Sequence, residues 1–294
     1  MNGIKSKYVS GLRWLFEAFS DIESEVQTLA RSSWSTNAGV LYLTKLWVLS
    51  DLHLEAVPYP EAFQPKPPIF DVLVAAGDIW QGDCLRAFRF LRQMAGAKPI
   101  VFVMGNHEHW NGVLHDDLAI AKALAREHGI ALLDGEAVII HECTFVGTTL
   151  WADHTLSLAG ANPAAETGEH IEISHEDGTR LITVGDAVEL HQASRSKLEH
   201  LVEQADRNLP LVVVSHHAPH PDCLTEAMRN TWSAGNSASD LSPILDGDRI
   251  ALWVHGHLHH SVNIVRGRAT RILCNPAGPR FSNVAFDESL VVDV

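Results

Sequence analysis

Five short apolar runs, each followed by a cluster of polar residues, constrain the fold of this chain most strongly. They are 46–55 (LWVLSDLHLE), 71–80 (DVLVAAGDIW), 99–108 (PIVFVMGNHE), 211–219 (LVVVSHHAP) and 251–259 (ALWVHGHLH). Helical stretches are predicted between several of them, at Cys84–Ala95, Asp116–His128 and Ala193–Arg207. Continuous Val, Ile and Leu runs that alternate with helices predict strands buried on both faces, and therefore an α/β fold.

Further strands are predicted without helices between them, which favours a layered sandwich over a simple doubly wound sheet. They lie at 144–151, 263–267, 270–276 and 289–294. Residues 153–191 are rich in Gly, Ala, Glu and His and are long for a connection between core elements, so a cap over a site and a decorative insertion both fit. With 46% hydrophobic and 20% charged residues among 294, the composition is that of a globular protein and excludes collagen-like, coiled-coil and wholly disordered chains.

Residues 1–39 differ from the domain predicted at 40–294. Apolar residues recur at helical spacing through 8–30, and 31–39 (RSSWSTNAG) is a small, polar linker. A helix packed on the domain surface is one interpretation, and an arm that forms a homo-oligomer or lies on a membrane is the other. The mixed charge of the segment and the lack of a Lys/Arg-rich face favour the first.

The charge and the cysteines restrict partners and compartment. Lys and Arg number 22 against 36 Asp and Glu, a net charge of −14, which argues against long nucleic acids and anionic membranes as partners. No apolar run approaches the roughly 20 residues of a membrane span, and the polar N-terminus is not a secretory signal. The 4 cysteines form no C-x-x-C pair, which predicts reduced thiols and a cytoplasmic protein.

The 18 histidines are many for a chain of this length, and several fall in the polar clusters where the apolar runs end. Ligand sites of α/β proteins lie at the carboxyl ends of strands, so these clusters are expected to converge. An extended backbone would also direct the side chains of Asp51 and His53, or of His257 and His259, to one side. The candidate metal ligands are Asp51, His53, Asp78, Asn106, His216, His257 and His259.

Two carboxylates, an amide oxygen and four imidazoles exceed the needs of one ion. They suit two ions about 3.5–4 Å apart that share a carboxylate, an arrangement that hydrolyses phosphate esters. Oxygen and nitrogen ligands without thiolate favour Mn, Fe, Co or Zn.

Several of these residues have alternative interpretations. Taken singly, Asp51 fits a turn and Asp78 fits a helix cap. His217 is adjacent to His216 and could replace it as a ligand. Strand alternation points His255 away from His257 and into the sheet. Three further histidines could line the entrance but are better interpreted as solvent-facing loop residues: His109, His220 and His260.

The ordered motifs resemble those of the calcineurin-like metallophosphoesterase superfamily. They are D-x-H at Asp51 and His53, GD at Gly77 and Asp78, GNHE from Gly105 to Glu108, HH-A-P from His216 to Pro219, and GH-x-H from Gly256 to His259. The resemblance implies a four-layer α/β/β/α sandwich of two mixed sheets. It also implies that His107 lies beside the metals and assists the leaving group.

The resemblance further implies how the ligands divide between two metal ions. One ion would take Asp51, His53, Asp78 and His259; the other would take Asp78, Asn106, His216 and His257, with Asp78 bridging. The chain departs from close relatives after Asn275-Pro276, where an Arg-Gly-Tyr-like stretch is replaced by AGPR, and Arg280 is only a weak substitute for that arginine.

Together these features predict a metal-dependent hydrolase of phosphoesters that uses two divalent or trivalent transition-metal ions and a metal-activated water. A small soluble phosphomonoester or phosphodiester is the expected substrate, since metals rather than Lys and Arg supply the positive charge. The alternatives are a catalytically silent scaffold on the same fold and an interaction protein that recruits a partner through its N-terminal helix. Silent relatives typically lose ligands or the catalytic histidine, and all are present here.

Overall fold

The structure of the chain, a computed structural model, describes residues 43–157, 173–175, 178–229, 231 and 233–294. These residues belong to one compact unit, Leu43–Val294. The helix predicted within residues 1–39 lies outside the described residues, and so does part of the segment 153–191.

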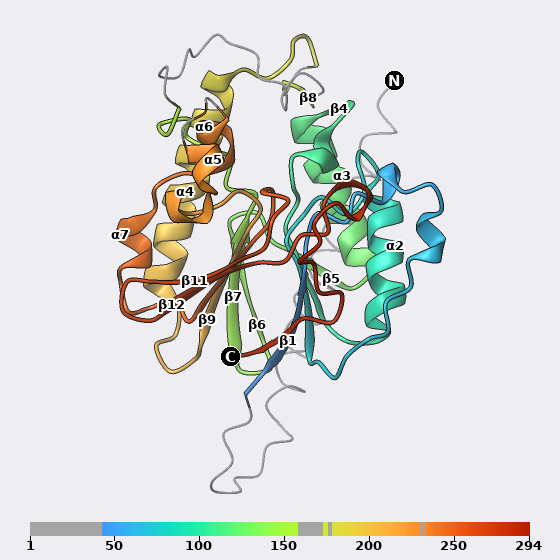
Figure 1. The fold of residues 1–294 in the computed structure, drawn as a ribbon, viewed down its shortest axis with the longest axis horizontal. Coiled ribbons are helices and arrows are strands. Elements are labelled where there is room, and N and C mark those ends of the chain that lie inside the picture. The colour runs from blue at the N-terminus through green and yellow to red at the C-terminus, as the bar shows by residue number, and fades with distance from the viewer. Residues whose placement is uncertain (1–42, 158–172, 176–177, 230, 232) are drawn as a thin grey trace, which may run out of the picture. The chain divides into compact units, whose positions relative to one another are not determined.

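Two mixed sheets lie at the centre of this unit (Figure 1). The first has the order β13 (Val291–Asp293), β1 (Lys45–Leu49), β2 (Val72–Ala75), β3 (Ile100–Phe102) and β5 (Ile130–Leu132), with β13 antiparallel to the rest. The second has the order β11 (Val262–Arg266), β12 (Thr270–Cys274), β10 (Leu252–His255), β9 (Leu211–Ser215), β7 (Cys143–Thr148) and β6 (Glu136–Ile140), with β11 and β6 antiparallel at its edges. A small parallel pair joins β4 (Gly112–Val113) to β8 (Ile173–Ser174).

Helices cover the outer face of each sheet, as Figure 1 shows. Beside the first sheet lie α2 (Cys84–Ala95) and α3 (Leu114–Glu127). Beside the second lie α4 (Val184–Gln204) and the short α5 (Glu226–Arg229), α6 (Ala234–Ser237) and α7 (Ser242–Leu245). Short 3-10 turns complete the described elements: η1 (Leu54–Ala56), η2 (Pro60–Ala62), η3 (His107–His109), η4 (Pro221–Cys223) and η5 (Pro279–Phe281).

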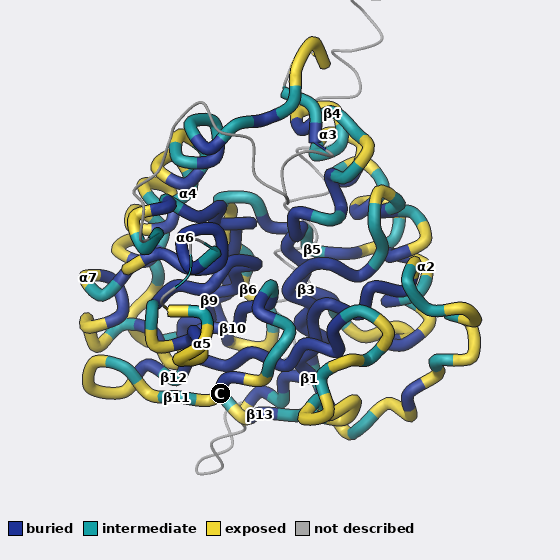
Figure 2. The backbone as a smooth tube through the Cα atoms, turned by 45° about the horizontal axis from the view of Figure 1, so that its top comes forward, coloured by how far each residue is buried: buried dark blue, intermediate teal, exposed yellow. Residues whose placement is uncertain are grey.

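Three apolar clusters separate the layers. Along β1, Trp47 and Leu49 pack with α2, whereas Leu46 and Val48 pack between the two sheets with strands such as β9 and β10. A third cluster joins the second sheet to α4 and to the segments after β9. Central strands such as β1, β3, β9 and β10 are therefore buried on both faces, and their tube is dark in Figure 2. The predicted four-layer sandwich of two mixed sheets is confirmed.

Three details differ from the sequence prediction or extend it. The helix expected from Ala193 begins earlier, at Val184, because Thr183 and Asp186 form a reciprocal capping box at its N-terminus. Residues 184–191 of the uncertain segment therefore belong to α4. Strands β5 and β6 were not predicted, since β5 is short and β6 is largely accessible to solvent.

All four cysteines are free and buried. Within the described residues, no helix combines the length and the apolarity needed to span a membrane.

Candidate metal centre

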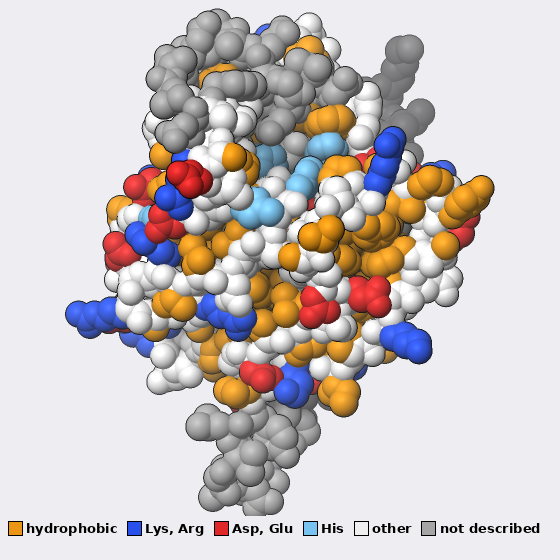
Figure 3. Space-filling view, in the orientation of Figure 1, with side chains coloured by type: hydrophobic (Ala, Val, Ile, Leu, Met, Phe, Trp, Pro, Cys, Tyr) orange, Lys and Arg blue, Asp and Glu red, His pale blue; other side chains and the backbone are white. Residues whose placement is uncertain are grey.

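The structure brings the seven predicted ligands together at one edge of the two sheets. Each follows the end of a strand: β1, β2, β3, β9 or β10. Figure 3 shows histidine side chains gathered in a hollow of this face. The ligands are Asp51 and His53 after β1, Asp78 after β2, Asn106 after β3, His216 after β9, and His257 and His259 after β10.

The ligand atoms form two groups that share one carboxylate. Asp51, His53, Asp78 and His259 each offer an atom within 4.8 Å of the others, and so do Asp78, His216 and His257. Asn106 joins the second group, because its Oδ1 lies 3.0 Å from Nε2 of His216 and 3.1 Å from Nδ1 of His257. Asp78 is thus placed where a bridging ligand is expected.

The hydrogen bonds around the second group leave acceptors that face one another. Nδ1 of His216 lies 2.8 Å from the carbonyl oxygen of Ala76, so this nitrogen carries the proton and donates it. With Nδ1 committed to this bond, the lone pair of a neutral His216 is on Nε2, which faces Oδ1 of Asn106 at 3.0 Å and Oδ2 of Asp78 at 3.2 Å. That Oδ2 is buried and has no hydrogen-bond partner among the described residues. Converging lone pairs of this kind fit a cation.

The first group shows the same pattern. His53 donates from Nδ1 to Glu55 at 3.0 Å, which leaves Nε2 facing Nε2 of His259 at 3.0 Å and Oδ2 of Asp78 at 3.7 Å. His259 lies 3.6 Å from Oδ1 of Asp51. A carboxylate that holds the far nitrogen of an imidazole is the usual support of a histidine metal ligand.

The backbone at these residues differs from the extended form expected from the sequence. Five of the seven have left-handed backbones, with φ of 49° at Asp51, 44° at His53, 56° at Asp78, 70° at His257 and 50° at His259. Their side chains converge because each strand has ended and the chain turns sharply, so the prediction from strand alternation was wrong. Left-handed φ at non-glycine residues is concentrated at functional sites.

Two glycines are required by close approach. A Cβ on Gly77 would lie 2.6 Å from the backbone nitrogen of Gly105 and from Nδ1 of His216. A Cβ on Gly105 would lie 2.1 Å from Oδ1 of Asp78. The glycines of the GD and GNHE motifs therefore let the loops touch, and at Gly77 φ is also 85°.

The carboxylates and imidazoles of the site shift one another's pKa values. Burial lowers the pKa of His53, but Glu55, Asp78 and Asp51 oppose it and raise that pKa to about 9. Burial also lowers the pKa of His216, and chiefly Asp78 raises it to about 10. Burial raises the pKa of Asp78, but His216 and other imidazoles hold it well below its usual range. The carboxylates therefore favour positive charge in this hollow.

Two carboxylates beside the ligands were given no role from the sequence, although Glu108 ends the GNHE motif. Glu55 binds His53, as described, and accepts the backbone N–H of Gln81 at 3.0 Å. Glu108 is 2% exposed and accepts the N–H groups of Asp78, Ile79 and Gly105 at 2.7–2.8 Å. Burial and the charge of Asp78 raise the pKa of Glu108 to about 7. The one sequence signal was an acidic residue close to a ligand in each motif.

His107 lies beside the first group. Its ring meets that of His53 edge-on, with centroids 4.5 Å apart, and its backbone N–H donates to Oδ1 of Asp78 at 3.0 Å. Burial lowers the pKa of His107, which keeps its imidazole closer to neutral than those of His53 and His216.

The structure also places the histidines that the sequence left open. His217 is buried, and Asp78 lies in the group with His216 rather than with His217. His255 is fully buried at the end of β10, as expected, and burial lowers its pKa to about 3. The solvent-facing interpretation was wrong for two others, since His109 is 3% and His220 is 4% exposed.

The exposed Arg280 has a left-handed backbone, with φ of 56°.

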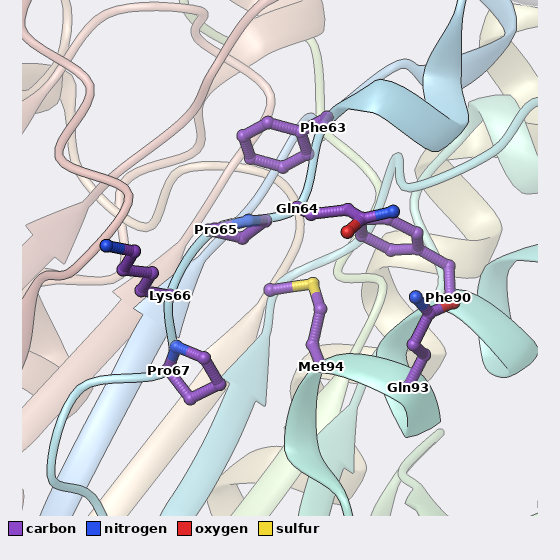
Figure 4. A pocket seen from close by; sticks show the side chains of 8 residues that line it. All are labelled: Phe63, Gln64, Pro65, Lys66, Pro67, Phe90, Gln93 and Met94. Carbon is purple, nitrogen blue, oxygen red and sulfur yellow. The ribbon is translucent and has the colours of Figure 1, made fainter.

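A pocket of about 270 Å³ lies between the 63–67 loop and α2 and is lined by none of the predicted ligands (Figure 4). Its walls are mainly apolar, from Phe63, Phe90 and Met94, so it lacks the donor set of a metal centre.

Comparison with known proteins gives a family model and one solved structure of similar fold. The family model described as calcineurin-like phosphoesterase matches residues 44–261. The crystal structure of phosphopantetheinyl hydrolase from Mycobacterium tuberculosis has a TM-score of 0.62 and 20% identity, over 87% of this chain and 97% of that one. A dimetal phosphatase from Danio rerio has a TM-score of 0.46 and 12% identity, over 79% of this chain and 87% of that one. No protein with a curated function matches the sequence.

Proposed function

This chain belongs to the calcineurin-like phosphoesterase family, and we propose that it hydrolyses small soluble phosphoesters at a dinuclear metal centre. The observation that carries the proposal is the shared carboxylate. Asp78 stands in both groups of ligand atoms, and its buried Oδ2 has no hydrogen-bond partner among the described residues.

In this proposal the first cation is held by Asp51, His53, Asp78 and His259, and the second by Asp78, Asn106, His216 and His257. Bound there, the cations supply positive charge to the phosphate oxygens and lower the pKa of water toward neutrality. The nitrogen and oxygen donors fit Mn, Fe, Co or Zn.

The chain's own residues prepare the site for that chemistry. Glu55 and the Ala76 carbonyl hold the Nδ1 protons of His53 and His216, so that both Nε2 lone pairs face the cation positions. As water forms its bond to phosphorus it would release a proton, the bond to the alcohol oxygen would break, and protonated His107 would give a proton to that oxygen, so that no net proton is gained or lost. Because burial lowers the pKa of His107, its imidazole is mostly neutral and must take up a proton before it gives one to the alcohol oxygen.

The substrate class follows from charge. A net charge of −14 disfavours long polyanions, whereas a small phosphoester needs only the local positive charge of two cations. A metal assay with a substrate panel tests this directly: aryl and alkyl phosphomonoesters, phosphodiesters, nucleotides and a phosphopantetheinyl ester. We expect about two transition-metal ions per chain and turnover of at least one small ester.

Asp78→Asn is the decisive variant. It keeps the shape of the side chain but weakens the ligand that both cations share, so we expect lower metal content and at least about a 100-fold loss of turnover. The matched control is Asp248→Asn, because Asp248 is half-exposed and pairs only with Arg268 among the described residues. Full activity of metal-replete Asp78→Asn protein would contradict the dinuclear proposal. An inactive wild-type chain would instead favour the silent scaffold.

A further inference from the structure

The imidazole of His107 is held by rings rather than by a hydrogen bond. The indole of Trp110 stacks on it, with centroids 3.8 Å apart and 20° between the planes. His53 meets the same imidazole edge-on, at 82°. Nδ1 of His107 is buried and has no hydrogen-bond partner among the described residues.

A histidine that gives a proton to a departing oxygen must hold its ring in one orientation. In most sites a carboxylate or carbonyl fixes the ring by accepting a hydrogen bond from its second nitrogen. That support is missing at His107 among the described residues. A nearly parallel indole at 3.8 Å leaves little room for the imidazole to swing, because any turn of the ring drives its edge into the indole.

Trp110 is itself anchored. Its backbone N–H donates to the carbonyl oxygen of His107 at 3.1 Å, which keeps the two residues within one turn. The indole packs against an apolar cluster defined by Leu114, Trp151, Ile173 and Ile182, to which Leu190 of α4 also contributes. Ile173 and Ile182 are fully buried, so the indole packs against the closed interior of this cluster.

We propose that Trp110 is the positioning residue of His107, and that stacking takes the place of a hydrogen-bonded carboxylate. The inference rests on the proposed function, since it concerns the proton that His107 delivers. Its effect is largest where the leaving alcohol is a poor leaving group and needs that proton.

Two substrates of the same bond class separate this role from a structural one. The p-nitrophenolate of a p-nitrophenyl ester leaves without being protonated. The alkoxide of an alkyl ester is a poor leaving group and needs an acid to protonate it. In Trp110→Leu we expect kcat for the alkyl ester to fall about 10- to 100-fold, with a much smaller fall for the p-nitrophenyl ester. His107→Asn should show the same selectivity, and the double variant should be no worse than His107→Asn. Trp110→Phe, which keeps a ring in the stack, should restore most of the alkyl activity.

The matched control is Leu190→Ala, which disturbs the same apolar cluster without touching the stack. It should change both rates by one factor. An equal loss on both esters in Trp110→Leu would overturn the positioning role and leave the proposed function standing.

A measurement independent of turnover examines the stack itself. The indole should shift the ring protons of His107 upfield in NMR spectra, and the His107→Asn variant identifies those signals. The shift should vanish in Trp110→Leu and persist in Trp110→Phe. If the wild-type protein shows no such shift, the positioning role is wrong whatever its activity. If the shift is present but no phosphoester is hydrolysed, the proposed function fails and the positioning role fails with it, although the stack exists.

Discussion

Glu108 joins the loops that carry Asp78 and Asn106, and Glu108→Gln should loosen both. Its Oε2 accepts the N–H groups of Asp78 and Gly105, and its Oε1 accepts that of Ile79. Gln has one oxygen, so an amide NH₂ must face at least one of these donors. If that oxygen still accepts the N–H groups of Asp78 and Gly105, the buried N–H of Ile79 loses its acceptor, at a cost of about 1–3 kcal/mol in the free energy of unfolding. Removing a charge that burial disfavours offsets part of this loss.

Urea unfolding of the metal-free protein measures the change. We expect a lower midpoint with an unchanged m-value, because the surface exposed on unfolding is the same. The control is Glu199→Gln, since Glu199 is half-exposed and pairs with Arg195 on α4, and it should stay within about 0.5 kcal/mol. Calorimetry should also show metal affinity lowered about 10- to 100-fold in Glu108→Gln. Wild-type stability together with wild-type affinity would refute the view that this carboxylate holds the loops.

Two further predictions concern other buried groups. Glu55→Gln should weaken metal binding about 10- to 100-fold at little cost in stability, because it removes the negative partner of His53 Nδ1; unchanged affinity in a metal titration would contradict this. Burial lowers the pKa of His191, so the folded state resists protonation, and stability is lost as pH falls below about 6.5, where the unfolded imidazole binds a proton. His191→Gln should therefore reduce the slope of unfolding free energy against pH between about 6.5 and 5, by at most about 1.4 kcal/mol per pH unit; an unchanged slope would show that His191 titrates normally.

The main layers of the fold could be predicted because their strands are buried on both faces. A short, continuous apolar run such as 211–215 is typical of a strand inside a sheet, and it forms β9. Edge strands carry a weaker signal: β6 pairs on one side only, and residues such as Ile139 are exposed to solvent there. The start of α4 was signalled by Thr183 and Asp186, but a threonine-aspartate spacing of three is common outside helices and gains meaning only with the apolar face that follows.

The ligand residues could be predicted for a similar reason, and their supports could not. Parallel strands of one sheet end at one edge, so the polar residues that follow β1, β2 and β3 were expected to meet, and the structure places those that follow β9 and β10 of the second sheet beside them. The contacts of Glu108 and the stack of Trp110 depend on where loops turn, and no periodicity encodes that. Burial of His109 and His220 was missed for the same reason, since residues after a strand end can turn either way.

The left-handed ligand residues explain why the supporting groups matter. A left-handed backbone at a non-glycine residue costs about 1–3 kcal/mol, although Asp and His adopt it more readily than most residues. The five left-handed ligand residues together therefore destabilise the fold by an amount that is large relative to the stability of an ordinary protein. Backbone hydrogen bonds beyond the strand ends offset this cost. The N–H of Asp51 donates to the carbonyl oxygen of Gly77 at 2.9 Å, and the N–H of His53 donates to that of Asp78 at 3.0 Å. Glu108 then ties the Asp78 loop to the next one. Because Asn also tolerates the left-handed region, Asp78→Asn should keep this backbone while weakening the shared ligand, which separates loss of metal from loss of fold.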